Sequence, residues 1–343
     1  MKFEDRIQLK LSDLTEELFE SYCKMIDKAI GGYFGLELWN GEHYHKDAIK
    51  LNTARNCFEY ILRTRHYRKV YIPYYTCEVM LQPLQKCGIE WEFYHIDKCF
   101  EPVGHYHLKA DEAFLYTNYW GLKQKCVERL ATEYDLHLIV DNAQAFYSPR
   151  IEGIDTFYSC RKFFGVADGA YLYTDSLLND EFEQDRSFTR MQHLLQRIDD
   201  GASAGYAVFR ANDDALTNQP IRKMSNLTDS LMSSINYEVV KRQRRANFEY
   251  LHKILGSNNG LYIPEIDNIV CPMIYPYLTS DAGLKKRLIE NKIFVATYWP
   301  NVFESCELEQ LEYHFADRII AMPIDQRYGI EDMHRIVKII NIK

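Results

Sequence analysis

Between residues 70 and 140, short apolar runs alternate with segments of helical periodicity, and this alternation constrains the fold more than any other feature. The expected strands cover residues 70–72, 89–97, 113–117 and 138–140, and the segment after the first of them has a helical pattern. Strands and helices that alternate in this way form a mostly parallel sheet with helices on its faces. We therefore expect an α/β fold built around such a sheet.

The length and composition indicate two domains. A chain of 343 residues, 47% of them hydrophobic, can bury a large core and is longer than one typical domain. We expect a large domain with the parallel sheet over residues 1–235 and a smaller α+β domain over residues 236–343. The smaller domain is expected to contain strands at 269–275 and 293–297 and helices near 280–290 and 331–340.

Three further segments have recognisable patterns. Apolar residues recur at helical spacing from residue 13 to residue 30, which predicts an amphipathic helix that ends at Gly31 and Gly32. Residues 180–224 are polar and irregular, which is typical of a functional or mobile loop, and we expect them over the site or in a subunit interface. Residues 225–255 favour one long helix.

The charge and the cysteine content argue against several classes of protein. A net charge of -8 and a pI near 5.8 disfavour a general nucleic-acid-binding protein, which normally has a basic face. The nine cysteines are odd in number and form no C-x-x-C pair, so they indicate neither a zinc knuckle nor a disulfide framework and favour a reducing cytoplasm. No run of about 18 apolar residues occurs, so no membrane span is expected. His43 and His45 lack supporting ligands at metal-binding spacing, and no metal site is expected.

Polar residues follow two of the expected strands. Asp141 and Gln144 come directly after the apolar run at 138–140, and Lys162 follows a short strand around 156–158. Ligands of open α/β sheets bind outside the carboxyl ends of the strands, so these three side chains are expected at one rim. They suit pyridoxal 5′-phosphate (PLP), which needs an amine for a covalent link and an acidic partner for its pyridine nitrogen. The alternative is that Asp141 caps a helix and Lys162 is a solvated surface lysine.

Thr53 marks the expected start of a helix. It precedes apolar positions at Phe58, Ile61 and Leu62, so it occupies the place of an N-cap residue. A helix amino terminus presents free backbone N–H groups and the positive end of the helix dipole, which suits a phosphate. Thr53 and the Ala54 backbone are therefore the expected phosphate site, the alternative being a simple helix cap.

These motifs resemble the sugar-nucleotide aminotransferases of the DegT and StrS group, which are PLP enzymes of fold type I. The most specific part is D-N-A-Q-A at 141–145, followed by Lys162 and D-G-A at 168–170. Residues 52–54 resemble the family's G-T-A turn, and residues 72–76 are similar to its V-P-x-x-T strand end. Residues 222–225 resemble its R-M-S helix start, and residues 322–324 its late L-P-L strand.

The resemblance implies a role for each site residue. Lys162 would form the covalent link to PLP and later move a proton, Asp141 would pair with the pyridine nitrogen, and Gln144 would contact the ring oxygen. Thr53, Ala54 and Ser159 would hold the phosphate, although the family's usual serine, five residues before the lysine, is Phe157 here. The family stacks an aromatic side chain on the ring where this chain has Cys77, so Tyr75, Tyr119 or Trp120 is expected to replace it.

The implied reaction is a ping-pong transamination from an amino donor, most often L-glutamate, to a keto-sugar nucleotide. This reaction belongs to polysaccharide or cell-surface glycan biosynthesis, and the resemblance also implies a homodimer with active sites at the subunit interface.

Three other functions remain open from the residues. Ser159-x-x-Lys162 matches the S-x-x-K pattern of serine acyl-enzymes, but their S-D-N and K-T-G elements are absent. A PLP-dependent lyase, dehydratase or desulfurase is compatible with the same fold. A non-catalytic relative that binds a sugar nucleotide is the third alternative, and it would be expected to lack Lys162 or Asp141.

Overall fold

The computed structural model describes residues 30–263 and 269–341. The amphipathic helix expected at residues 13–30 lies almost entirely outside this range. Residues 1–38 and 39–343 are separate units, and the described part of the first unit, residues 30–38, contains no helix or strand. In the described part of the chain, no helix is both long and apolar enough to cross a membrane.

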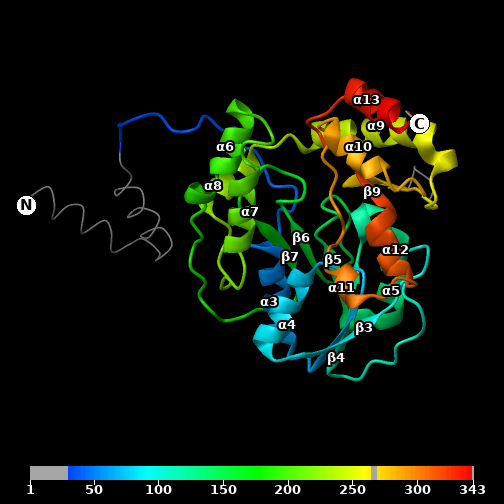
Figure 1. Ribbon diagram of the computed structural model, residues 1–343. Helices are drawn as coiled ribbons and strands as arrows, with labels where there is room; N and C mark the ends of the chain where they lie inside the picture. The colour runs from blue at the N-terminus through cyan, green and yellow to red at the C-terminus, as the bar shows by residue number, and fades with distance from the viewer. Residues whose placement is uncertain (1–29, 264–268, 342–343) are drawn as a thin grey trace, which may run out of the picture. The chain divides into compact units, whose positions relative to one another are not determined.

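A mostly parallel sheet of seven strands forms the centre of the second unit, as the alternating pattern predicts (Figure 1). The strand order is β1-β7-β6-β5-β4-β2-β3. Strands β2 to β6 run parallel to one another, whereas β7 is antiparallel to both β1 and β6. The bounds are β1 Ile49–Leu51, β2 Lys69–Pro73, β3 Glu90–Tyr94, β4 Glu112–Thr117, β5 Leu138–Asn142, β6 Asp155–Ser159 and β7 Ala170–Tyr173.

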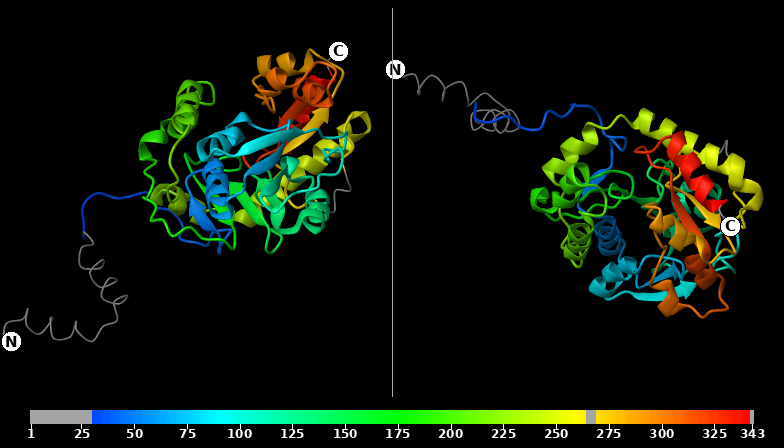
Figure 2. Two further views of the ribbon diagram at one scale, coloured as in Figure 1. Left: turned by 90° about the horizontal axis from the view of Figure 1, so that it is seen from below. Right: turned by 45° about the horizontal axis from the view of Figure 1, so that its top comes forward.

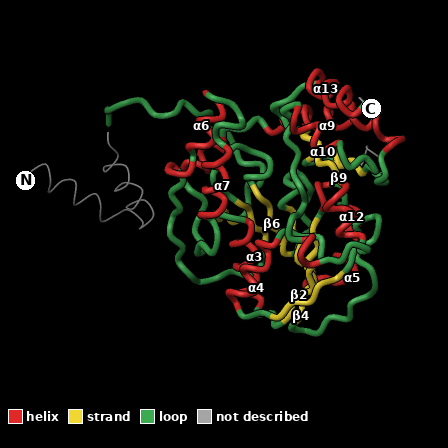
Figure 3. Tube along the Cα trace, in the orientation of Figure 1, coloured by secondary structure: helices red, strands yellow, loops and turns green. Residues whose placement is uncertain are grey.

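Helices cover both faces of this sheet, and the alternation of side chains along each strand explains why. On β4, Ala113 and Leu115 belong to one apolar cluster while Phe114 and Tyr116 belong to the other. The first cluster packs against α3 (Ala54–Arg65) and α4 (Leu81–Cys87), and the second includes residues of α5 (Gln124–Tyr134). Because both faces are covered, β4, β5 and β6 are buried along their whole length, as is typical of parallel sheets, whereas the first three residues of the edge strand β3 are exposed. Figure 3 shows these strands surrounded by helices.

The carboxyl-terminal part has its own two-stranded sheet of antiparallel β8 (Ile274–Leu278) and β9 (Ile319–Pro323). The long α9 (Tyr237–Leu255) packs on β8, and α13 (Ile330–Ile340) lies beside α9 (Figure 2). The remaining helices are α10 Leu284–Glu290, α11 Val302–Ser305 and α12 Leu311–Arg318. The expected division at residue 235 remains a prediction, because residues 39–343 form one compact unit. Short 3₁₀ helices occupy Glu78–Met80, Tyr119–Gly121, Asp135–His137, Phe188–Arg190 and Gly256–Asn258.

Four expectations for local structure are wrong. Residues 180–224 are not simply irregular, because they contain α6 (Gln192–Asp199) and α7 (Tyr206–Ala215). The expected helix at 225–255 is two helices, α8 (Asn226–Ser233) and α9, because the Asn236 side chain accepts a hydrogen bond from the Val239 N–H and starts a new helix. Residues 293–297 form no strand, only a single bridge from Ala296 to Ala321, and the strand expected at 269–275 begins at Ile274.

Candidate active site

The registers of the sheet bring the expected site residues to one edge. Asp141 lies opposite Thr117 at the carboxyl ends of β5 and β4, and the next strand, β6, ends at Ser159. Ser159 pairs with Ala170, which in turn pairs with Leu51 at the end of β1. The chain therefore enters α3 through Thr53 at the same edge at which β6 delivers Ser159 and the turn to Lys162.

Asp141 is a buried carboxylate, with 5% of its surface exposed. The Ala143 N–H donates a hydrogen bond of 2.8 Å to its Oδ1 atom. Burial raises the pKa of Asp141 to about 6, although the Ala143 N–H and the Lys162 ammonium favour the charged form. A carboxyl group held in this way is suited to a cationic partner, because a second positive charge beside it would stabilise its charged form.

Gln144 has one hydrogen-bonding atom without a partner. Its Oε1 atom accepts a hydrogen bond of 3.3 Å from the Trp120 N–H, but its buried Nε2 atom has no partner among the described residues. A buried donor without an acceptor lowers the stability of the folded chain, so an acceptor is expected at this position. The ring oxygen of a bound cofactor would supply one, so Gln144 fits the role that the sequence predicts for it.

Lys162 lies in a tight turn after β6. The Phe163 and Phe164 N–H groups both donate to the Cys160 carbonyl, at 3.1 and 2.9 Å, which fixes the turn. The Lys162 side chain is exposed and, within the described ranges, makes no hydrogen bond or ion pair. Its charge lowers the pKa of Asp141 and of Cys77, against the larger effect of burial on both groups. The ammonium thus lies near both the carboxylate and the thiol.

Thr53 is the N-cap of α3, as the sequence predicts. Its Oγ1 atom accepts a hydrogen bond of 3.2 Å from the Asn56 N–H and also contacts the Asn56 side chain. The N–H groups of Ala54 and Arg55 have no partner in the part of the chain that the structure describes. Two backbone donors therefore remain for an anion, while the Thr53 hydroxyl already serves the helix.

Ser159 lies on the same face of β6 as Phe157, because residues two apart in a strand point the same way. The Phe157 ring stacks on Phe58 of α3, with ring centroids 6.1 Å apart, and both are in the apolar core. Phe157 is therefore unable to replace the hydroxyl of the family's serine. Ser159, one pleat closer to the strand end, brings a hydroxyl to the same face.

The aromatic candidates near Cys77 differ in accessibility. Tyr75, Tyr119 and Trp120 are fully buried in one aromatic cluster, whereas Cys77 is half-buried at the edge. The role of Tyr75 as a cofactor contact remains a prediction. Tyr298, between α10 and α11, lies near Cys77: burial raises its pKa to about 12, with a smaller contribution from the thiol. Sequence reasoning missed this tyrosine because it comes from a segment far along the chain.

The two histidines at the start of the unit have hydrogen-bonding partners within the fold. His43 Nδ1 lies 2.6 Å from the Tyr171 hydroxyl, and His45 Nε2 lies 2.9 Å from the Phe146 carbonyl oxygen. Burial lowers the pKa of His45 to about 4, so this ring is neutral at physiological pH. Both rings help to pack the amino-terminal segment on β7.

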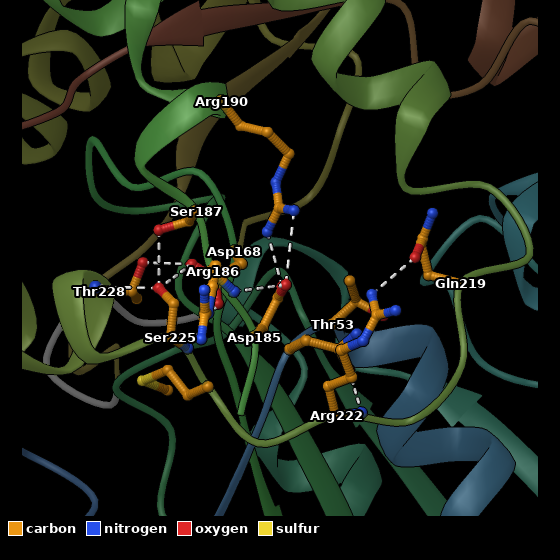
Figure 4. A network of polar contacts seen from close by, with 12 residues as sticks. Thr53, Asp168, Asp185, Arg186, Ser187, Arg190, Gln219, Arg222, Ser225 and Thr228 are labelled. Atoms are coloured by element: carbon orange, nitrogen blue, oxygen red, sulfur yellow. Dashed lines mark hydrogen bonds and ion pairs between the residues drawn. The ribbon is translucent and has the colours of Figure 1, made fainter. Parts of the chain in front are cut away.

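The D-G-A motif at 168–170 connects the Lys162 turn to α8. The buried Asp168 carboxylate accepts hydrogen bonds from the Ser225 N–H (2.8 Å), the Ser225 hydroxyl (2.7 Å) and the Thr228 hydroxyl (Figure 4). The Ser225 hydroxyl also lies 2.7 Å from that of Ser187. Asp168 thus holds the amino end of α8 and the segment before α6 beside the site.

Known proteins were compared with this chain by sequence and by structure. No protein-family model matches the sequence, and no curated protein matches it either. Among solved structures, a DegT, DnrJ, EryC1 and StrS aminotransferase from Brucella abortus is 15% identical, with a TM-score of 0.56 over 98% of this chain and 95% of that one. The chain has the fold of these aminotransferases. The expected α/β fold and the resemblance to this fold are therefore confirmed.

Two further solved structures are similar to this chain. DesI, solved in the presence of its TDP-sugar product, is 16% identical, with a TM-score of 0.58 over 85% of this chain and 79% of DesI. NtdA from Bacillus subtilis, solved with bound cofactor PMP, is 12% identical, with a TM-score of 0.58 over 85% of this chain and 73% of NtdA. At these identities, the likeness extends to the fold.

Proposed function

We propose that this chain is a PLP-dependent aminotransferase that transfers an amino group from an amino acid, L-glutamate being the expected donor, to a keto-sugar nucleotide. The observation that carries the proposal is the convergence of Asp141, Gln144 and Lys162 at the carboxyl ends of β5 and β6. The aminotransferase fold, the TDP-sugar product of DesI and the PMP bound to NtdA support it.

Asp141 and Gln144 would contact the two polar groups of the cofactor ring, the pyridine nitrogen and the ring oxygen. When bound, PLP supplies a conjugated ring that accepts electrons as a Cα–H bond of the substrate breaks. The Asp141 carboxylate would keep the proton on the pyridine nitrogen, and the positive charge there would return the Asp141 pKa toward its ordinary value. The unpaired Nε2 of Gln144 would donate to the ring oxygen.

Lys162 would bind the cofactor aldehyde and, once released by the amino donor, would move a proton between the substrate Cα and the C4′ atom. An exposed lysine without a hydrogen bond is free to reorient for both tasks. The Ala54 N–H and the Ser159 hydroxyl would donate to the phosphate, beside Thr53. Cys77 would leave more room over a bound ring than an aromatic side chain at this position.

The proposed partners are two small molecules and a second copy of the chain. Large apolar side chains are exposed on the segment from residue 188 to residue 206, at Phe188, Leu195, Ile198 and Tyr206, which supports a homodimer. We propose a cytoplasmic location, since the eight cysteines within the described ranges are all free. The product, an amino sugar nucleotide, would serve glycan biosynthesis.

Cofactor binding tests the proposal first. Purified protein titrated with PLP is expected to develop a visible absorption band that borohydride removes, and Lys162→Ala should abolish this band. Lys125→Ala, which removes an exposed lysine on α5, is the matched control and should retain it. A wild-type protein that takes up no PLP would overturn the whole proposal.

Half-reactions then separate an aminotransferase from the other PLP enzymes. With L-glutamate alone, an aminotransferase releases 2-oxoglutarate once per site and retains the amine form of the cofactor. A lyase or dehydratase would instead turn over its single substrate without a second one. The amine form is then offered keto-sugar nucleotides, and Asp141→Ala should bind PLP yet fail in both halves.

A further inference from the structure

An ion pair lies directly beside the candidate site lysine. The Arg161 Nη2 atom is 2.8 Å from the Asp213 Oδ1 atom, so the turn after β6 is tied to α7. The Arg161 side chain is 17% exposed and the Asp213 side chain 44% exposed. Arg161 is thus the more buried partner, and it has a carboxylate from a helix 52 residues further along the chain as its counter-charge.

Asp213 interacts with three cations in all. Burial opposes its charged form, but Arg161, Lys162 and Arg55 together lower the pKa of Asp213 below its ordinary value. Arg55 in turn donates a hydrogen bond of 2.9 Å to the neutral Gln82 side chain. We call these four residues, Arg55, Arg161, Lys162 and Asp213, the Arg161 cluster. Lys162 also lies near the Asp141 carboxylate, but the two guanidinium groups of Arg55 and Arg161 have only Asp213 as a carboxylate within the cluster, so the cluster favours a further anion.

The Arg161 cluster adjoins both expected phosphate contacts. Arg161 is two residues after Ser159, and Arg55 is the second residue of α3, where its own N–H has no partner among the described residues. Phe157, buried against Phe58, leaves the family's usual serine hydroxyl without a replacement at its own position. A phosphate at this edge would therefore have fewer hydroxyl ligands and more guanidinium groups than the family pattern implies.

We infer that Arg161 is a ligand of the cofactor's phosphate. In the chain without cofactor, Asp213 occupies the position of the phosphate beside Arg161, and the phosphate displaces the Asp213 side chain when the cofactor binds. The inference rests on the proposed function. A phosphate monoester carries about 1.5 to 2 negative charges and three acceptor oxygens, against one charge on Asp213, so it is the stronger partner for a guanidinium. Asp213, nearly half exposed on α7, can turn into water at little cost.

The inference predicts that these residues determine the preference for PLP over pyridoxal, which lacks the phosphate. Apoprotein is titrated with each compound while the visible band is followed, and the ratio of the two dissociation constants isolates the contribution of the phosphate. Arg161→Gln should reduce this ratio about 10- to 100-fold, the range expected for losing one hydrogen bond to a charged group, with pyridoxal binding nearly unchanged. Asp213→Asn should tighten PLP about 3- to 10-fold.

A matched pair of controls comes from Arg68 and Asp111, which form an ion pair of 3.2 Å just before β2 and β4, at the opposite end of those strands. Arg68→Gln and Asp111→Asn should leave the ratio unchanged. Inorganic phosphate should compete with PLP more weakly in Arg161→Gln and more strongly in Asp213→Asn. Arg161→Lys, which keeps the charge, should retain part of the preference.

The possible results separate this inference from the proposed function. If the protein takes up PLP through Lys162 and both Arg161→Gln and Asp213→Asn keep the wild-type ratio, the inference is wrong and the proposed function stands. If Arg161→Gln weakens the binding of PLP and of pyridoxal equally, the substitution has disturbed the turn after β6. The Asp213→Asn variant then tests the inference, and an unchanged affinity of this variant for PLP overturns it. If wild-type protein binds no PLP, both are overturned.

Discussion

The Asp141 carboxyl links the chemistry of the site to the stability of the protein. Burial raises its pKa to about 6 in the folded chain, whereas in the unfolded chain the pKa is about 4. The folded state therefore binds the proton more tightly. This contribution to stability is fully present below about pH 4 and is lost as the pH rises through about 6.

Asp141→Asn should remove the loss of stability that accompanies ionisation of the buried Asp141 carboxyl. Relative to wild-type apoprotein, the variant's free energy of unfolding is expected to rise between pH 4 and pH 7, by up to roughly 3 kcal/mol for a shift of about two pKa units. Urea denaturation of the two apoproteins across this range measures the difference. Asp155→Asn, at a buried carboxylate paired with Arg65 at 2.9 Å, should instead destabilise the protein. A difference for Asp141→Asn that does not vary with pH would contradict the buried, protonated carboxyl.

Gly169 explains why the D-G-A motif contains glycine. Its φ angle is +105°, and an added Cβ would lie 2.8 Å from the Thr228 side chain and 3.1 Å from the Cys160 sulfur atom. Its N–H donates to the Asn52 carbonyl at 2.6 Å, so the strand before α3 and the Lys162 turn meet here. Only glycine permits both the backbone conformation and the close approach.

Gly169→Ala is therefore expected to lower the free energy of unfolding by roughly 2 to 4 kcal/mol, through steric overlap and backbone strain together. Gly104→Ala is the control, because Gly104 has a φ of +92° but no atom within 4 Å of an added Cβ. It should show the strain alone, roughly 1 kcal/mol. Chemical denaturation compares the two. Equal losses would show that the contact with α8 is unimportant.

At the scale of elements, Asp168 fixes α8 and the segment before α6 relative to the sheet. Its carboxylate accepts three hydrogen bonds from Ser225 and Thr228. Asp168→Ala should therefore destabilise the protein by roughly 3 kcal/mol and increase amide hydrogen exchange selectively over residues 180–233. Asp185→Ala, which removes a carboxylate paired with Arg190 at 2.6 Å, is a control within the same network (Figure 4). An increase in amide hydrogen exchange that is uniform over the chain after Asp168→Ala would contradict an anchoring role for Asp168.

The elements that the sequence predicts correctly are those whose signals are local. β4, β5 and β6 are buried on both faces, and β2 has the apolar run Val70 to Ile72, so the apolar residues were sufficient to locate these four strands. The cap at Thr53 likewise marks the start of α3. Helices α6 and α7 have no side-chain cap hydrogen bond and many polar residues, so their pattern resembled a loop. The break before α9 depends on one capping asparagine.

The features of the candidate site also divide into those with a local signal in the sequence and those that depend on the tertiary structure. The spacing of Asp141, Gln144 and Lys162 along the chain was sufficient to predict that they lie at one edge of the sheet, because carboxyl ends of neighbouring parallel strands meet there, and their roles remain a proposal. The ion pair of Arg161 with Asp213 joins two elements whose relative position only the tertiary structure defines. Phe157 was recognisable as a departure from the family pattern, but its packing on Phe58, which explains why it offers no ligand, was not.

At the scale of the whole molecule, the exposed apolar side chains around α6 provide the basis for a prediction on assembly. Leu195 is 59% exposed and Ile198 81% exposed, on the same short helix, and Phe188 and Tyr206 are exposed nearby. In Figure 1, α6, α7 and α8 lie together, away from α13. Exposed apolar groups so close together favour burial against another surface, and the proposed homodimer would supply one.

Sedimentation equilibrium is expected to show a dimer for the wild-type chain and a monomer for the double variant Leu195→Glu, Ile198→Glu, because two charges would enter an apolar interface. Val103→Glu, at a residue 51% exposed in the loop after β3, is the control and should remain dimeric. The monomeric variant should keep the wild-type free energy of unfolding at low protein concentration, since neither side chain contributes to the core. A wild-type monomer would overturn the proposed homodimer, and a dimer that tolerates both glutamates would place the subunit interface elsewhere on the molecule.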